Sequence, residues 1–139
     1  MTQASNDSSP ANKDELLLNV VNMVADEYQK TQGSADIFGI WCMPHESMLL
    51  STCIEYSGDS FAPWKHRNPE VPEAILSLWR LMDRSWSCLI LVICAKTGEF
   101  KVEFLNEAEI ERDLEVYYDF PGQTRQFLAV SNGSFKHVS

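Results

Sequence analysis

The pattern of apolar and polar residues is clearest over residues 86–104, where it predicts a β-hairpin. Residues 89–93 are all apolar, which is typical of a strand covered on both faces. Over residues 99–104 apolar and charged residues alternate, which indicates a strand with one buried and one solvent-exposed face. Gly98 lies between the two strands, where a tight turn favours glycine. We therefore expect this hairpin to form part of a central sheet.

Two other stretches show the spacing of amphipathic helices. Residues 13–30 carry an apolar stripe, and Asn12 precedes Glu15 with the spacing of an N-terminal capping box. Residues 72–84 carry a second stripe and begin at Pro72, which is favoured in a first helical turn. Both stripes are suited to covering a sheet.

The remaining elements are shorter. Residues 37–43 and 48–56 read as two strands joined by a turn at Pro44. Residues 57–72 contain one glycine and three prolines and are expected to form an irregular loop. Residues 127–130 are expected to form a last edge strand.

These elements predict an α+β fold in one domain over residues 13–130, with the order α-β-β-α-β-β-α-β. The sheet is expected to be mainly antiparallel, with the helices packed on one face. A chain of 139 residues is long enough for one core of this kind. Residues 1–12 are expected to be a disordered lead-in, and residues 131–139 a polar tail.

Net charge narrows the choice of partners. Eleven Lys and Arg against twenty Asp and Glu give a formal charge of −9, which disfavours nucleic acid and anionic membranes as partners. It favours either simple solubility or a basic protein partner. The longest apolar run is far shorter than the ~20 residues of a membrane helix, and residues 1–13 lack the apolar core of a secretion signal. We therefore expect a cytoplasmic protein.

Catalytic signatures are absent from the sequence. The three histidines lack metal-ligand spacing, and no nucleotide-binding or nucleophile motif occurs. No cysteine pair has C-x-x-C spacing, and all four cysteines fall in apolar runs, where a free thiol is usually buried: Cys42, Cys53, Cys88 and Cys94. We expect no catalytic residue, no metal and no cofactor, and hence not an enzyme. A small hydrolase that uses one of the cysteines is an alternative.

Carboxylates gather directly after the hairpin. Between Glu103 and Asp119 there are seven of them and a single base, Arg112. On a short helix they would form an acidic ridge with like charges at i and i+4, which is mildly unfavourable for folding. Such a local cost suggests a binding role, although a merely solvated helix face is the alternative.

A tryptophan in the 57–72 loop is a further candidate, because it lies beside three consecutive basic residues, 65–67. It either belongs to a contact patch or anchors the loop to the domain. The candidate partner-binding residues are therefore Glu107, Glu109, Glu111, Asp113, Glu115, Asp119 and Trp64.

The chain resembles the YezG-type family of bacterial immunity proteins. The resemblance lies in the helix over residues 74–82, in Ser85-Trp86-Ser87 before the apolar strand, and in Thr97-Gly98-Glu99-Phe100-Lys101-Val102-Glu103-Phe104 followed by carboxylates. The chain departs from the family in a compressed segment before that helix and an added C-terminal stretch. The resemblance implies a non-enzymatic antitoxin that binds a cognate toxin, often a nuclease, and blocks its active site. An acidic surface suits a basic nuclease domain.

A second class of function stays open. Small acidic α/β proteins also act as secretion chaperones, which bind effector segments, usually as homodimers. That function requires an exposed apolar groove. The oligomeric state is not fixed by the sequence.

Overall fold

The computed structural model describes residues 12–58, 60–107 and 119–131, and it shows a single α+β domain with a five-stranded antiparallel sheet. The order of strands across the sheet is β4-β3-β2-β5-β6. In chain order the elements are α2 (Lys13–Lys30), β2 (Ile37–His45), β3 (Met48–Ser57), β4 (Ser60–Trp64), α3 (Glu70–Leu81), β5 (Cys88–Cys94), β6 (Phe100–Leu105) and α6 (Phe120–Ser131).

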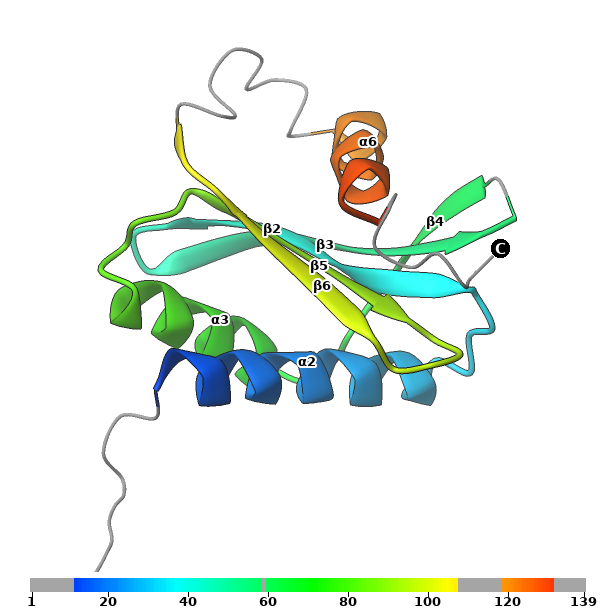
Figure 1. The fold of residues 1–139 in the computed structure, drawn as a ribbon, viewed down its shortest axis with the longest axis horizontal. Coiled ribbons are helices and arrows are strands. Elements are labelled where there is room, and N and C mark those ends of the chain that lie inside the picture. The colour runs from blue at the N-terminus through cyan, green and yellow to red at the C-terminus, as the bar shows by residue number, and fades with distance from the viewer. Residues whose placement is uncertain (1–11, 59, 108–118, 132–139) are drawn as a thin grey trace, which may run out of the picture.

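The sheet lies between two layers of helices (Figure 1). Helices α2 and α3 cover one face, and α6 lies on the opposite face. The expectation that the helices pack on one face is therefore wrong for α6. The two faces have separate apolar clusters, one around Ile40 and Leu91 under α2 and α3, and one around Trp41 and Phe127 under α6.

Strand β5 confirms the prediction from its continuous apolar run. Every residue from Cys88 to Cys94 is buried. Leu89 and Leu91 belong to the cluster under α2 and α3, whereas Ile90 and Val92 belong to the cluster under α6. Strand β6 is an edge strand that pairs with β5.

Helix α2 begins and ends where the sequence predicts. The side chain of Asn12 accepts a hydrogen bond from the backbone N–H of Glu15 over 2.8 Å, and so it caps the first turn. Near the other end, the ring of Tyr28 stacks on Phe38 with a centroid separation of 4.1 Å. This contact fixes the end of α2 on β2.

The 57–72 segment is not an irregular loop throughout. Ser60–Trp64 form β4, which pairs with β3 as the edge of the sheet. Pro63 made a strand unexpected from the sequence. An edge strand tolerates proline, however, because one side of its backbone needs no hydrogen-bonding partner. Helix α3 begins at Glu70, two residues before the expected start at Pro72.

Pro44 lies in β2 rather than in the turn that follows. It is opposite Leu49 of β3, whereas the pairing of β2 with β5 ends at Cys42. Pro44 has no backbone N–H to donate, and at this position β5 offers no group that would need one.

Residues 127–130, expected to be an edge strand, form the end of helix α6. Asp119 caps this helix, since its carboxylate accepts a hydrogen bond from the backbone N–H of Gly122 over 2.8 Å. Pro121 lies in the first turn, where its missing N–H costs nothing. Phe127 is fully buried against the sheet.

Candidate functional site

The acidic segment is described only at its two ends. Glu107 and Asp119 are both exposed, and Asp119 also caps α6. Four of the candidate carboxylates lie outside the described residues: Glu109, Glu111, Asp113 and Glu115. Glu103, on β6, forms a 3.6 Å ion pair with Lys101.

Trp64 lies in the core rather than on the surface. Its side chain packs edge-on against Tyr28 at a centroid distance of 5.1 Å, and the residue is 8% exposed. The indole N–H donates to the carbonyl oxygen of Ile54 over 3.0 Å. Trp64 therefore anchors the segment to the domain and presents little surface to a partner.

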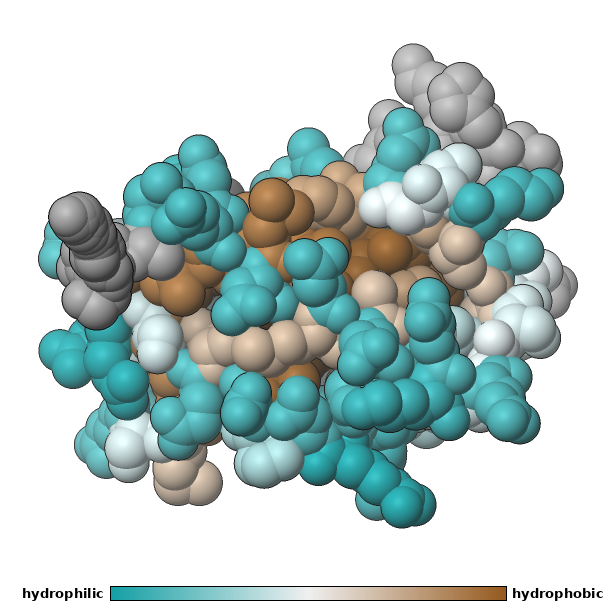
Figure 2. Space-filling view, turned by 90° about the horizontal axis from the view of Figure 1, so that it is seen from below, coloured by the Kyte–Doolittle hydropathy of each residue, from teal (hydrophilic) through white to brown (hydrophobic). Residues whose placement is uncertain are grey.

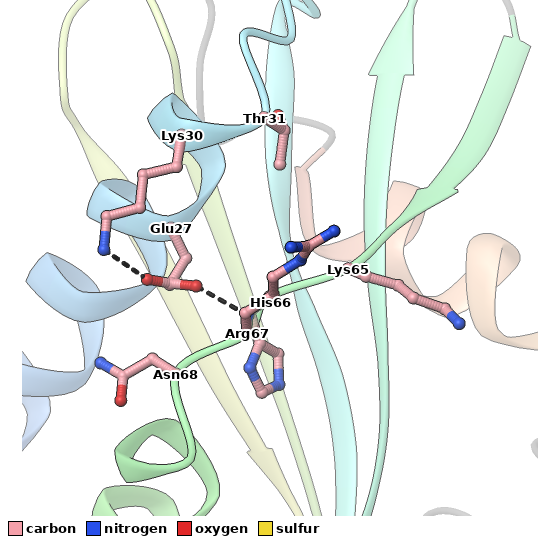
Figure 3. Close-up of a pocket in the computed structure, with 7 residues that line it drawn as sticks. All are labelled: Glu27, Lys30, Thr31, Lys65, His66, Arg67 and Asn68. Atoms are coloured by element: carbon pink, nitrogen blue, oxygen red, sulfur yellow. Dashed lines mark hydrogen bonds and ion pairs between the residues drawn. The ribbon is translucent and has the colours of Figure 1, made fainter.

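The basic residues beside Trp64 do line a surface cleft (Figure 3). This cleft has a volume of about 800 Å³ and lies between the end of α2 and the linker that joins β4 to α3. Its lining residues are Glu27, Lys30, Thr31, Lys65, His66, Arg67 and Asn68. We call it the α2–linker cleft.

A buried carboxylate holds the α2–linker cleft together. Glu27 accepts a hydrogen bond from the backbone N–H of Arg67 over 2.7 Å and one from the ammonium of Lys30 over 2.9 Å. Only 4% of Glu27 is exposed. The hydrogen bond from Arg67 and the contact with Lys30 outweigh the effect of burial and hold the pKa of Glu27 below its ordinary value. Glu27 therefore stays charged and fixes the linker on α2.

The sequence carried a signal for Glu27 that was missed. Glu27 follows Val20 and Val24 at helical spacing on the buried side of α2. A carboxylate within an apolar stripe needs a hydrogen-bonding partner, because a buried charge without one is costly. The partner is the linker backbone, which no sequence pattern reveals.

All four cysteines are free and buried. Burial raises the pKa of Cys53 and of Cys88 to about 12 and that of Cys42 well above its ordinary value. These three thiols are therefore protonated and poorly nucleophilic at neutral pH.

Cys94 is different. Burial raises the pKa of its thiol, but hydrogen bonds from the Thr97 hydroxyl and from the backbone N–H groups of Thr97 and Lys96 outweigh this effect, and its pKa lies below the ordinary value. The residue is only 1% exposed. The thiol lies at the β5–β6 turn, where access of a substrate is restricted.

The described part of the chain exposes apolar surface in at least two places. One is a hollow of about 350 Å³ at the tip of the β2–β3 hairpin, where Met48 is 69% and Leu50 is 42% exposed. The other lies on the side of the sheet that carries α2 and α3, where apolar surface shows between hydrophilic side chains (Figure 2). Val102 and Phe104 of β6 are only partly buried on this side, and Phe100 is 38% exposed.

Within the described residues, no three histidine, cysteine or acidic side chains lie close enough to hold a metal ion. Nor does the described part of the chain contain a helix that is both long and apolar enough to cross a membrane. A scan against known protein families finds none that matches the chain, and a search of curated proteins finds no significant match. The resemblance to YezG-type immunity proteins therefore stays a prediction.

Proposed function

We propose that this protein is a cytoplasmic, non-enzymatic immunity protein that binds a cognate toxin, with a basic nuclease domain as the partner. The observation that carries this proposal is the concentration of carboxylates from Glu103 to Asp119, seven acidic residues against one base. Glu107 and Asp119, at the described ends of this segment, are exposed and therefore accessible to a partner.

Charge supports the same proposal. A formal charge of −9 steers a basic partner toward the protein and raises the rate of association. Carboxylates that cover the cationic active site of a nuclease would compete directly with its nucleic-acid substrate. The protein itself needs no catalytic residue for this function.

The test first asks whether the open reading frame next to the gene encodes a toxin domain, and then uses that domain as the binding partner. The double substitution Glu111→Lys and Glu115→Lys is expected to weaken binding of the toxin domain by at least about a hundredfold, because two attractive charges become repulsive. Cells that carry the variant should lose protection from the toxin. Circular dichroism and thermal unfolding check that the fold is retained.

A matched control reverses two other exposed carboxylates, Glu70→Lys and Glu73→Lys, in the first turn of α3. This control makes the same change in net charge at another place and should preserve protection. Full protection by the Glu111→Lys, Glu115→Lys variant would remove the acidic segment from the interface.

The exposed hollow at the β2–β3 hairpin favours a second candidate function, a secretion chaperone that binds an effector segment as a homodimer. Met48 and Leu50 give it the exposed apolar surface that such a function requires. Sedimentation equilibrium separates the two candidates. A stable homodimer that becomes monomeric on Met48→Ser and Leu50→Ser supports the chaperone, and a monomer supports the immunity protein.

A further inference from the structure

The linker after β4 presents its basic side chains in a fixed way. Residues 65–68 form the linker between β4 and α3 and have no regular secondary structure. His66 turns inward, and its Nδ1 is buried, whereas Lys65 and Arg67 are exposed (Figure 3). The hydrogen bond from the Arg67 backbone to Glu27 keeps this arrangement in place.

The charges of Lys65 and Arg67 are not balanced by the described part of the protein. No carboxylate of the described residues lies within 4.0 Å of either side chain, although the domain is strongly acidic. In the same cleft, by contrast, Lys30 has ion pairs to both Asp26 and Glu27, at 3.5 and 2.9 Å. The two linker cations are therefore available for an external anion.

The carboxylates nearest to the α2–linker cleft do not block it. Both oxygens of Glu27 already accept hydrogen bonds, and its charge is shared with Lys30. Asp26 is paired with Lys30. Carboxylates elsewhere are screened over about 8 Å at physiological ionic strength.

We propose that the α2–linker cleft is a binding site for a phosphate-type anion, with Arg67 and Lys65 as its principal ligands. The planar guanidinium of Arg67 matches the oxygens of a phosphoryl group in a two-pronged contact, and Lys65 adds a mobile point charge on a flexible stem. Figure 3 shows the guanidinium of Arg67 below Thr31, whereas the side chain of Lys65 extends away from Glu27 and Lys30.

The size of the cleft narrows the ligand further. At about 800 Å³ it is larger than a single phosphate ion and falls in the range of small-molecule sites. The ligand is therefore a phosphomonoester of a small molecule, whose phosphoryl group meets Arg67 and Lys65. The proposal of this site depends neither on the acidic segment nor on the proposed immunity function.

The test is a titration of the full-length, nitrogen-15-labelled protein followed by amide resonances. The probes are inorganic phosphate and glycerol 3-phosphate at neutral pH, each against sodium chloride at equal ionic strength. We expect saturable shifts of the amides of residues 65–68 and of Lys30 and Thr31. A smaller dissociation constant for glycerol 3-phosphate than for phosphate supports a phosphomonoester site. Equal constants would mean that the cleft recognises only the phosphoryl group, and would contradict a site for a phosphomonoester.

Substitutions make the test specific. Lys65→Gln with Arg67→Gln should weaken binding of both probes by about tenfold or more, because charged hydrogen bonds are lost. The backbone hydrogen bond to Glu27 remains in this variant. The matched control, Lys96→Gln with Arg125→Gln, removes the same charge from two exposed positions elsewhere and should leave the constants unchanged. Shifts that equal those caused by chloride, or that persist in the Lys65→Gln, Arg67→Gln variant, would overturn the proposal.

Discussion

The carboxylate of Glu27 accepts a hydrogen bond from the backbone N–H of Arg67 over 2.7 Å, so one side chain of α2 fixes the linker between β4 and α3. Glu27→Ala leaves this partly buried N–H without an acceptor, and we expect it to lower the free energy of unfolding by about 2 kcal/mol. Glu27→Gln keeps an acceptor oxygen but loses the charge opposite Lys30 and should cost about half as much. Urea unfolding measures both.

The control for Glu27 is Asp26→Ala, one residue earlier on α2. The Asp26 side chain is 67% exposed and takes part only in a surface ion pair with Lys30, which contributes about 0.5 kcal/mol or less. A loss at Asp26 as large as that at Glu27 would contradict the special role of the buried carboxylate.

Glu27 also predicts a dependence of stability on acid pH. Its pKa in the folded protein is lowered, first by the hydrogen bond from the Arg67 backbone and then by Lys30, from an ordinary value of 4.5. The unfolded chain therefore takes up the proton at higher pH than the folded protein does. The stabilisation is complete above pH 4.5 and is lost as pH falls through the lower pKa of the folded state. The difference in urea midpoint between wild type and Glu27→Gln should shrink over that range.

For Tyr28 we expect the opposite dependence, a loss of stability as the pH rises in the alkaline range. Its hydroxyl donates to Glu55 over 2.7 Å and accepts from the backbone N–H of Ala35 over 2.9 Å. Burial, followed by the hydrogen bond to Glu55, raises the pKa of Tyr28 from 10.0 to about 12. The stabilisation is present below pH 10.0, the ordinary pKa of tyrosine, and is lost as the pH rises toward the pKa of Tyr28 in the folded protein. Urea unfolding between these limits should show the loss, and Tyr28→Phe should remove it.

At neutral pH, Tyr28→Phe is expected to cost about 1–3 kcal/mol, because the buried N–H of Ala35 loses its acceptor. Tyr56→Phe is the matched control, since the Tyr56 hydroxyl makes no hydrogen bond within the described residues. Equal losses from the two substitutions would show that the ring, and not the hydroxyl, carries the effect at Tyr28.

Periodicity and capping predicted much of the fold. Asn12 caps α2 as its spacing with Glu15 indicated, and the helix ends at Lys30 as expected. The hairpin of β5 and β6 also follows directly from its pattern, because a doubly covered strand and a half-covered strand differ in sequence. These features could be predicted because they depend on residues that are close together in the sequence.

The errors arose where distant contacts decide the structure. Phe127 and the three residues after it are too few to show a period, and it is the sheet surface that selects a helix there. Pro63 suggested a loop, but pairing with Ile54 makes an edge strand. The α2–linker cleft depends on Glu27 meeting a backbone group forty residues later, a contact that no local pattern contains.

The thiol of Cys94 is expected to react before the other three. Hydrogen bonds from Thr97 and Lys96 lower its pKa, whereas burial raises the pKa of Cys53 and Cys88 to about 12. Iodoacetamide labelling of the folded protein, followed by peptide mass spectrometry, should therefore find Cys94 modified first. Thr97→Val should slow this labelling, and urea should make all four cysteines equally reactive.

Slow labelling of Cys94 at the rate of the other thiols would show that burial, and not its pKa, controls the reaction. That outcome would also count against any function that uses a cysteine as a nucleophile. Thr52→Val, on strand β3, which β2 separates from β5, is the control for the loss of a hydroxyl and should leave the rate for Cys94 unchanged.

Gly39 is expected to be intolerant of any side chain. A methyl group at this position of β2 would collide with the backbone carbonyl oxygen of Leu91 and would lie 3.0 Å from the ring of Phe127. Because the obstacle includes backbone, β2 and β5 would have to separate, and we expect Gly39→Ala to cost about 3 kcal/mol or to prevent folding. Shortening Phe127 to Leu in the Gly39→Ala background should not restore stability, since the Leu91 carbonyl remains. Recovery of the thermal midpoint in that double variant would mean that the packing of α6, and not the strand pairing, requires glycine.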